Sequence, residues 1–227
     1  MANDKLPIRV VCATRLPRDK FLSHTALGKS IKSLIDVSKA EVKLYADNST
    51  GLGELYNKAI EESTDNPAIL VFAHDDIVLC DYFWVERIRD GVEKFDIAGV
   101  VGNVRRVAKQ PSWFFIDDKF TRDNASNFSG GVFPPTKEFP CHPIGLECKL
   151  LDGLLLAVKS EVLINSKLRF DEIFKFHFYD LDFCRQAELK NLKMGTIPLA
   201  LIHKSVGNFV SNEWNDAYQT YLDKWKE

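Results

Sequence analysis

The sequence has few cysteines, and they form no recognisable framework. Five cysteines stand among 227 residues, an odd number with no CxxC pair. A disulfide scaffold needs paired cysteines and a structural zinc site needs four closely spaced ligands, so the pattern favours neither. No secretory signal pattern precedes them. We therefore expect reduced thiols and a cytoplasmic location.

The sequence also lacks an excess of either charge and lacks a long apolar run. It has 30 Lys and Arg against 32 Asp and Glu, which provides no electrostatic argument for nucleic acid as a partner. No apolar run approaches the roughly 18 residues of a membrane span, although peripheral binding at the inner face of a membrane stays open. What is present is 45% hydrophobic and 27% charged residues, the composition of a globular protein with a real core.

Short β-branched runs alternate with segments of helical periodicity. This alternation predicts an α/β fold whose central sheet is mostly parallel and is covered by helices on both faces. The expected strands are 8–14, 41–47, 68–73 and 96–102, and the expected helices are 20–35, 51–63 and 82–95.

The second half of the chain is less regular. Residues 103–150 are rich in Pro, Gly, Asn and aromatic residues, which is typical of a functional loop or a partly disordered insertion. Regular patterns return at 151–164 and 176–205. No second domain is evident, so we expect one domain over 1–227.

The segment 211–226 is predicted to be an amphipathic helix with one aromatic stripe. Side chains three and four residues apart share a helix face. We expect this face to pack against the domain, with a homodimer or membrane face as the alternative. The stripe consists of Trp214, Tyr218, Tyr221 and Trp225.

Polar residues follow three of the expected strands. In such sheets ligands bind beyond the carboxyl ends of the strands, so one crevice is expected to collect these side chains. They are Thr14 and Arg15, Asp47 and Asn48, and His74, Asp75 and Asp76.

The adjacent Asp75 and Asp76 suit a divalent cation. Carboxylate oxygens are preferred by Mg²⁺ and Mn²⁺, and Mn²⁺ also tolerates imidazole, which His203 could supply from downstream. The alternatives are a solvated turn in which Asp75 caps the next helix, and a buried, satisfied histidine at 203.

A second carboxylate pair, Asp180 and Asp182, stands at the start of a predicted helix. Positions two apart on a helix point about 200° away from each other, so both cannot face one substrate. We expect one of them to be catalytic and the other structural, with helix capping by Asp180 as the alternative.

The order of these segments resembles the family 2 glycosyltransferases of the GT-A fold, which use nucleotide sugars. The resemblance covers roughly residues 8–207. Its pieces, in order, are "IRVVCAT", "LYADNS", "GLGELYNKAIE", "FAHDD", "LDGLLLAVKSEVL", "FYDLDFCRQAELKNLKMGTIP" and "LALIHKSVG".

The resemblance implies a role for individual residues. Asp47 would contact the nucleotide base, Asp76 and His203 would hold the metal, and Asp180 would be the catalytic base. The loop 103–150, with Trp113 in its aromatic run 113–115, would be an acceptor platform or a lid, because aromatic faces pack on sugar rings. The alternative is a disordered or packing insertion. The other nucleotide-sugar contacts would be Thr14, Arg15, Asn48, Asn57 and Asp75, and the other acceptor-side residues Asp152 and Gly153.

Two positions depart from the family pattern. His74 stands where the metal motif usually opens with aspartate, so that either Asp75 takes over its ribose contact or the contact is lost. Tyr179 stands where an acidic residue commonly precedes the catalytic aspartate.

The implied function is inverting transfer of a sugar from a nucleotide diphosphate sugar, with UDP first among the nucleotides, to an acceptor hydroxyl. The acceptor would be a saccharide, a lipid-linked or a protein-linked molecule in bacterial-type polysaccharide or glycoconjugate synthesis. The cofactor would be Mn²⁺ or Mg²⁺. The alternative is a catalytically silent nucleotide-sugar-binding or partner subunit. A nucleotidyltransferase would need an early glycine-rich phosphate loop, which "ATRLPRDK" does not provide.

Overall fold

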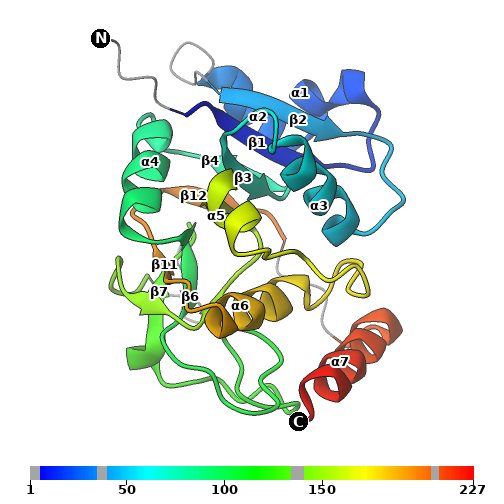
Figure 1. The fold of residues 1–227 in the computed structure, drawn as a ribbon, viewed down its shortest axis with the longest axis vertical. Coiled ribbons are helices and arrows are strands. Elements are labelled where there is room, and N and C mark those ends of the chain that lie inside the picture. The colour runs from blue at the N-terminus through cyan, green and yellow to red at the C-terminus, as the bar shows by residue number, and fades with distance from the viewer. Residues whose placement is uncertain (1–5, 35–39, 134–140, 206–209) are drawn as a thin grey trace.

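A seven-stranded sheet forms the centre of the protein (Figure 1). The computed structural model describes residues 6–34, 40–133, 141–205 and 210–227. The strand order is β2-β1-β3-β10-β5-β11-β8. The strands are β1 Ile8–Ala13, β2 Ala40–Tyr45, β3 Ile69–Ala73, β5 Ile97–Gly99, β8 Glu147–Cys148, β10 Leu155–Lys159 and β11 Met194–Thr196.

The sheet is mostly parallel, which confirms the α/β prediction. β1 runs parallel to β2 and β3, and β11 runs parallel to β5. The central strand β10 runs against both of its neighbours, β3 and β5, and β8 runs against β11. The first residue of β10, Leu155, therefore pairs with the last residue of β3, Ala73. As a result, the segment that precedes β10 reaches the rim where the parallel strands end.

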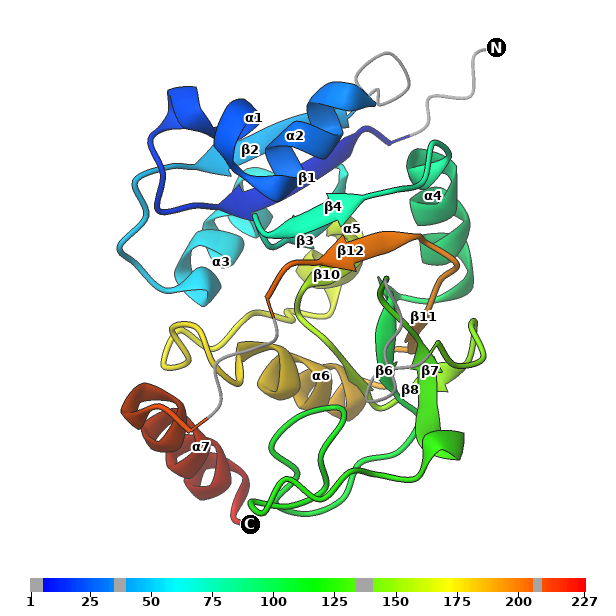
Figure 2. The same cartoon turned by 180° about the vertical axis from the view of Figure 1, so that it is seen from behind.

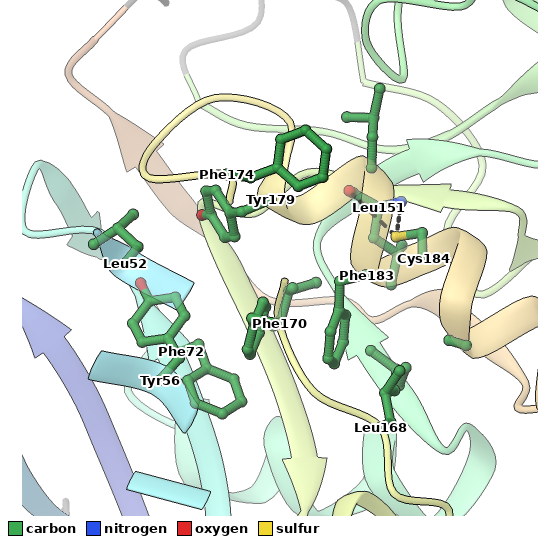
Figure 3. Close-up of a cluster of buried hydrophobic side chains, with 14 of the residues drawn as sticks. Leu52, Tyr56, Phe72, Leu151, Leu168, Phe170, Phe174, Tyr179, Phe183 and Cys184 are labelled. Carbon is green, nitrogen blue, oxygen red and sulfur yellow. Dashed lines mark hydrogen bonds between the residues drawn. The ribbon is translucent and has the colours of Figure 1, made fainter. Parts of the chain in front are cut away.

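Helices cover both faces of the sheet, and an apolar core lies under each layer. One core includes Tyr56, Leu163 and Phe183, and the other includes Leu27 and Ile88. The close-up in Figure 3 shows the aromatic centre of the first core, which we call the aromatic core. The helices are α1 Phe21–His24, α2 Ala26–Ser33, α3 Leu52–Glu62, α4 Trp84–Lys94, α5 Ser160–Asn165, α6 Tyr179–Leu189 and α7 Asn212–Trp225.

The helix predicted over 20–35 is interrupted at Thr25. The backbone of Thr25 is extended (ψ 155°), and its hydroxyl accepts a hydrogen bond from the N–H of Gly28 at 2.9 Å. A side-chain cap of this kind starts a new helix. The short helix α1 therefore ends before Thr25 and α2 begins after it, while residue 35 lies outside the described residues.

Two small sheets extend the structure beyond the predicted strands. β4 (Ile77–Leu79) pairs with β12 (Leu201–His203), and β6 (Val101–Asn103) lies between β7 (Phe128–Gly130) and β9 (Leu150–Leu151). The strand predicted over 96–102 is thus divided between β5 and β6.

The 103–150 insertion is more regular than its composition suggested, because it contains β7, β8 and β9. It is also held from inside by the buried Asp123, which accepts hydrogen bonds from Asn103, Arg105 and Asn127. Residues 134–140 of the insertion lie outside the described residues.

The C-terminal helix α7 packs against the domain through its aromatic stripe, as predicted. The rings of Trp214 and Tyr218 lie 5.2 and 5.4 Å from the ring of Phe178, and both side chains are buried. Both ribbon views place α7 beside α6 (Figures 1 and 2). Among the described helices, none combines the length and the apolar composition that crossing a membrane requires.

A buried carboxylate joins α6 to α7. Asp182 has no exposed surface, and Lys224 Nζ lies 2.6 Å from its Oδ1, while the indole N–H of Trp225 donates to the same oxygen at 2.9 Å. Gln186 donates to the other oxygen at 2.6 Å. Asp182 is therefore the structural member of the carboxylate pair that the sequence analysis singled out.

We expect Lys224→Met to lower the free energy of unfolding by about 3 kcal/mol or more, because it leaves the buried Asp182 without its cation and also removes the pair with Asp171. The matched control is Lys20→Met, whose pair with Asp19 is exposed and is worth less than about 1 kcal/mol. Urea denaturation followed by circular dichroism measures both. Equal midpoints for the two variants would contradict the assigned role of Lys224.

Candidate functional site

The candidate site lies at the rim of the sheet, directly after β3. His74, Asp75 and Asp76 stand at this strand end, as predicted. The backbone N–H of His74 donates to the carbonyl of Leu154 at 3.0 Å, and the N–H of Lys204 donates to the carbonyl of Asp76 at 3.1 Å. The start of β10 and the end of β12 therefore hold the segment from two sides.

The pairing of β4 with β12 brings His203 to Asp76 (Figure 2). His203 Nε2 lies 3.4 Å from Asp76 Oδ1, and His74 Nδ1 lies 3.9 Å from the same oxygen. Ligand atoms of all three residues lie within 4.8 Å of one another. We call these three residues the His-Asp-His cluster. The predicted metal residues Asp76 and His203 are brought together, and the structure adds His74 to them.

The His-Asp-His cluster fits a divalent cation. Asp76 Oδ1 and His203 Nε2 are buried and make no hydrogen bond among the described residues. Unsatisfied buried polar atoms are costly, so two of them facing each other call for a shared partner. One carboxylate and two imidazoles form a donor set that suits Mn²⁺ and other borderline divalent cations.

Electrostatics within the cluster favour an ionised Asp76. Burial opposes its ionisation, but the contact with His203 and the nearby His74 outweigh burial and lower the pKa of Asp76. Burial also disfavours charge on His203, yet Asp76 and Asp152 raise the pKa of His203 above its usual value. Burial lowers the pKa of His74 in spite of the surrounding carboxylates. A cation and a proton compete for the imidazole nitrogen, so cation binding to the protonated form of His203 would release a proton.

Asp180 lies beside this cluster, on the first turn of α6. Its Oδ2 accepts from the N–H of Gly153 at 2.9 Å, and its Oδ1 accepts from the N–H of Leu181 at 2.9 Å. Burial and the charge of Asp152 raise the pKa of Asp180 to about 7, although the two N–H donors oppose the shift. A carboxyl group with a pKa near neutrality is suited to accept a proton during a reaction.

Asp152 and Trp113, both predicted for the acceptor side, are in contact in the structure. The indole N–H of Trp113 donates to Asp152 Oδ2 at 2.7 Å, and the N–H of Leu154 donates to Oδ1 at 2.9 Å. The Trp113 ring is only partly exposed and packs against Phe114 and Phe128. Trp113 therefore positions Asp152, and its role as an acceptor platform stays a prediction.

The residues predicted for the nucleotide lie together at the ends of β1 and β2. The N–H of Asn48 donates to the carbonyl of Thr14 at 2.9 Å, and the N–H of Asp47 donates to the carbonyl of Leu16 at 3.1 Å. Asp47 has a left-handed backbone (φ 50°). Arg15 is exposed beside them. Their contacts to a nucleotide stay predictions.

Asn57 differs from the other predicted residues because its amide is used inside the fold. Its Nδ2 donates to the carbonyl of Phe170 at 2.8 Å and to Glu172 at 3.0 Å, and its Oδ1 accepts from the N–H of Phe170. Asn57 thereby ties α3 to the segment before α6. Its predicted contact with the nucleotide sugar stays untested.

A small pocket of about 80 Å³ opens at the site, with His74, Asp75, Asp76 and Phe176 in its lining. A larger surface pocket of about 460 Å³ lies against α2 and is lined by residues such as His24 and Lys29. It contains none of the predicted site residues. We assign the chemistry to the smaller pocket, because it adjoins the His-Asp-His cluster.

Sequence reasoning missed two residues of the site, His74 as a cluster member and Tyr179. The only sequence signal was that both depart from the family pattern. The structure shows them in contact, with His74 Nε2 at 2.7 Å from the Tyr179 hydroxyl.

No protein-family model matches the sequence, and no curated protein matches it. Solved structures do resemble its fold. GalNAc-T7, crystallised with UDP, GalNAc and Mn²⁺, is similar with a TM-score of 0.55 and 10% identity, over 97% of this chain and 48% of that chain.

Two further structures are similar at lower TM-scores. A197 from STIV matches with a TM-score of 0.48 and 11% identity over 91% of this chain and 100% of that chain. TarS of S. aureus matches with 0.43 and 12% identity over 84% of this chain and 35% of that chain. This chain thus spans about half of GalNAc-T7 and about a third of TarS. The strand order and the GalNAc-T7 match show that the chain has a GT-A-type fold.

Proposed function

We propose that this protein is a metal-dependent, inverting glycosyltransferase. It would transfer a sugar from a nucleotide diphosphate sugar, with a UDP-sugar as first candidate, to the hydroxyl of a saccharide, a lipid-linked or a protein-linked acceptor. The observation that carries the proposal is the shared anchoring of the His-Asp-His cluster and Asp180. The turn at 152–154 bonds to both, through the carbonyl of Leu154 to His74 and through the N–H of Gly153 to Asp180.

In the proposed reaction Asp180 accepts the proton of the acceptor hydroxyl. The hydroxyl oxygen forms a bond to the anomeric carbon on the face opposite the diphosphate, which inverts that carbon. The bond from this carbon to the diphosphate oxygen breaks, and its electron pair leaves with the nucleoside diphosphate. General-base assistance of this kind is worth about 10²- to 10⁴-fold in rate.

The cofactor proposed for this reaction is Mn²⁺ or Mg²⁺, held by His74, Asp76 and His203. When bound, such a cation neutralises charge on the diphosphate and so improves the leaving group. The support from this chain is the pair of buried ligand atoms on Asp76 and His203, which lie 3.4 Å apart and make no hydrogen bond among the described residues. The support from comparison is the fold shared with GalNAc-T7, whose crystals contain UDP and Mn²⁺.

A catalytically silent nucleotide-sugar-binding subunit is the second candidate. The observation that favours it is that both oxygens of Asp180 already accept backbone hydrogen bonds. Each carboxylate oxygen has a second lone pair, however, so Asp180 can still accept a proton. Turnover assays separate the two candidates.

We expect Asp180→Asn to reduce sugar transfer by at least about 100-fold while nucleotide-sugar binding changes much less, because the amide cannot take up the proton. The substitution also takes the acceptor from one of the N–H groups of Gly153 and Leu181, which donate to the two carboxylate oxygens. Asp182→Asn, two residues away on the same helix, is the matched control and should keep its turnover per folded molecule. Single-turnover transfer and calorimetric donor binding measure the two effects. Undiminished transfer by Asp180→Asn would remove Asp180 from the catalytic role.

The pKa of Asp180 predicts opposite pH trends for activity and stability. Transfer should rise with pH through about 7, because the proton acceptor must be ionised. The folded-state pKa lies above the ordinary value of 3.8, so the stability contribution of Asp180 is complete below that value and is lost as pH rises through about 7. The melting temperature of Asp180→Asn relative to the wild type should therefore increase over the same range. A melting-temperature difference that does not change with pH, together with a transfer rate that does not change with pH, would contradict the role of Asp180 as the proton acceptor.

We expect Asp76→Ala to weaken Mn²⁺ binding by more than about 100-fold, because loss of a ligand exceeds the 10- to 100-fold cost of losing a ligand's hydrogen-bond partner. Asp75→Ala is the matched control, since Asp75 is outside the His-Asp-His cluster. Calorimetric titration with Mn²⁺ in the absence of nucleotide measures both. Wild-type affinity should also increase with pH as His203 loses its proton. Equal Mn²⁺ affinity for the two variants would rule out this site.

A further inference from the structure

The two residues that depart from the family pattern form a single interaction. His74 follows β3 and Tyr179 begins α6, 105 positions later, and His74 Nε2 lies 2.7 Å from the Tyr179 hydroxyl. Two substitutions that are separate in the sequence are therefore one contact in the fold. This contact directs which nitrogen of His74 is left for the His-Asp-His cluster.

The direction of the hydrogen bond follows from counting protons. Tyr179 has one hydroxyl proton, which it donates to the carbonyl of Gly153 at 2.9 Å. A carbonyl oxygen can only accept, so the hydroxyl oxygen is left to accept from His74, and Nε2 of His74 carries the proton. In a neutral imidazole the other nitrogen is then unprotonated. That nitrogen, Nδ1, is the one that faces Asp76 Oδ1 at 3.9 Å.

The Tyr179 ring is held in place on all sides. It is only 3% exposed, and it packs 6.0 Å from the rings of both Tyr56 and Phe170 in the aromatic core (Figure 3). On the other side of the contact, Phe176 stacks on the His74 ring at 6.1 Å and 22°. The Tyr179 ring is therefore fixed by buried neighbours, whereas Phe176, which is 54% exposed, covers one face of the His74 ring.

Gly153 links this contact to Asp180. Its carbonyl accepts from Tyr179, and its N–H donates to Asp180. A Cβ at position 153 would lie 2.2 Å from the Tyr179 hydroxyl and 2.9 Å from Asp180 Cβ, so a side chain here would push both groups away. The hydrogen bonds that connect His74 to Asp180 thus pass through Gly153, where no larger residue fits.

We propose that Tyr179 is a positioning residue, which holds His74 with Nδ1 toward Asp76 and so makes His74 the third ligand for a divalent cation. Through Gly153 the same hydroxyl also fixes the position of His74 relative to Asp180. The role of the cation in transfer rests on the proposed function, whereas the orientation of His74 does not.

The first test is the protonation pattern of the His74 ring without metal, measured by long-range ¹H–¹⁵N NMR. The signals of His74 are those missing in His74→Asp. We expect Nε2 to be protonated in the wild type and both nitrogens to be partly protonated in Tyr179→Phe, which keeps the ring and removes the hydroxyl. Tyr56→Phe is the matched control. It removes a buried hydroxyl that makes no hydrogen bond among the described residues, on a ring next to Tyr179.

The second test is Mn²⁺ affinity by calorimetry, with urea denaturation to show that each variant folds. We expect Tyr179→Phe to bind Mn²⁺ about 10- to 100-fold more weakly, the usual cost of losing a hydrogen-bond partner of a metal ligand. Tyr56→Phe should bind like the wild type. A double-mutant cycle with His74→Asp tests whether the two residues act together. In the His74→Asp background, removal of the Tyr179 hydroxyl should change the Mn²⁺ affinity much less, because the imidazole that this hydroxyl positions is already absent.

Wild-type Mn²⁺ affinity in Tyr179→Phe, or an unchanged His74 protonation pattern, would overturn the proposal. A wild-type protein that binds no Mn²⁺ would contradict the metal site of the proposed function and the ligand role of His74. The NMR measurement would then still decide whether Tyr179 orients the ring, so the two failures are distinguishable.

Discussion

The turn at 152–154 is the constraint on which the candidate site depends. Asp152 accepts from Trp113, Gly153 bonds to both Tyr179 and Asp180, and the carbonyl of Leu154 accepts from the N–H of His74. This turn reaches the rim because β10 runs against β3, so that the beginning of one strand meets the end of the other. A parallel β10 would carry the turn to the opposite edge of the sheet.

Burial and charge are balanced differently at each acidic residue of the site. At Asp76 the neighbouring imidazoles outweigh burial and lower its pKa, which keeps a ligand oxygen ionised. At Asp180 burial acts together with the charge of Asp152, and the pKa rises to about 7. The surroundings thus move the pKa values of two side chains of the same type in opposite directions, which agrees with the two roles proposed for them, cation binding and proton uptake. Asp182 has a third environment, in which Lys224 compensates the buried charge and joins α6 to α7.

His74 and Tyr179, the two residues that depart from the family 2 pattern, are in contact in the structure. Each alone weakens the resemblance to family 2 glycosyltransferases. Together they replace two expected acidic residues by a neutral hydrogen-bonded pair next to Asp76, Asp152 and Asp180. Such a pair avoids adding negative charge to a site that already has three carboxylates.

Much of the fold could be predicted from local patterns. The apolar run 68–73 predicted a strand, which the structure has at Ile69–Ala73, and the spacing of apolar residues over 51–63 predicted a helix, which it has at Leu52–Glu62. Both follow because each period reports which side chains are buried. The interruption at Thr25 was missed, since a polar residue between apolar ones is compatible with a continuous helix until its side chain is seen to cap one. The short strands β4, β7, β8 and β9 were missed because two or three residues are too few to show a period.

The sequence by itself singled out the candidate residues of the site. The places of Asp76, Asp180 and His203 after strands and at a helix start made them candidates, and their individual roles were implied by the family resemblance. The aromatic stripe of α7 followed from its spacing. Only the tertiary structure decided how they are combined, since strand direction and contacts across 105 positions leave no mark in local periodicity. The antiparallel direction of β10 and the hydrogen bond between His74 and Tyr179 both depend on the packed sheet. The partners of each contact are far apart in the sequence, and the sequence around one partner does not indicate the other.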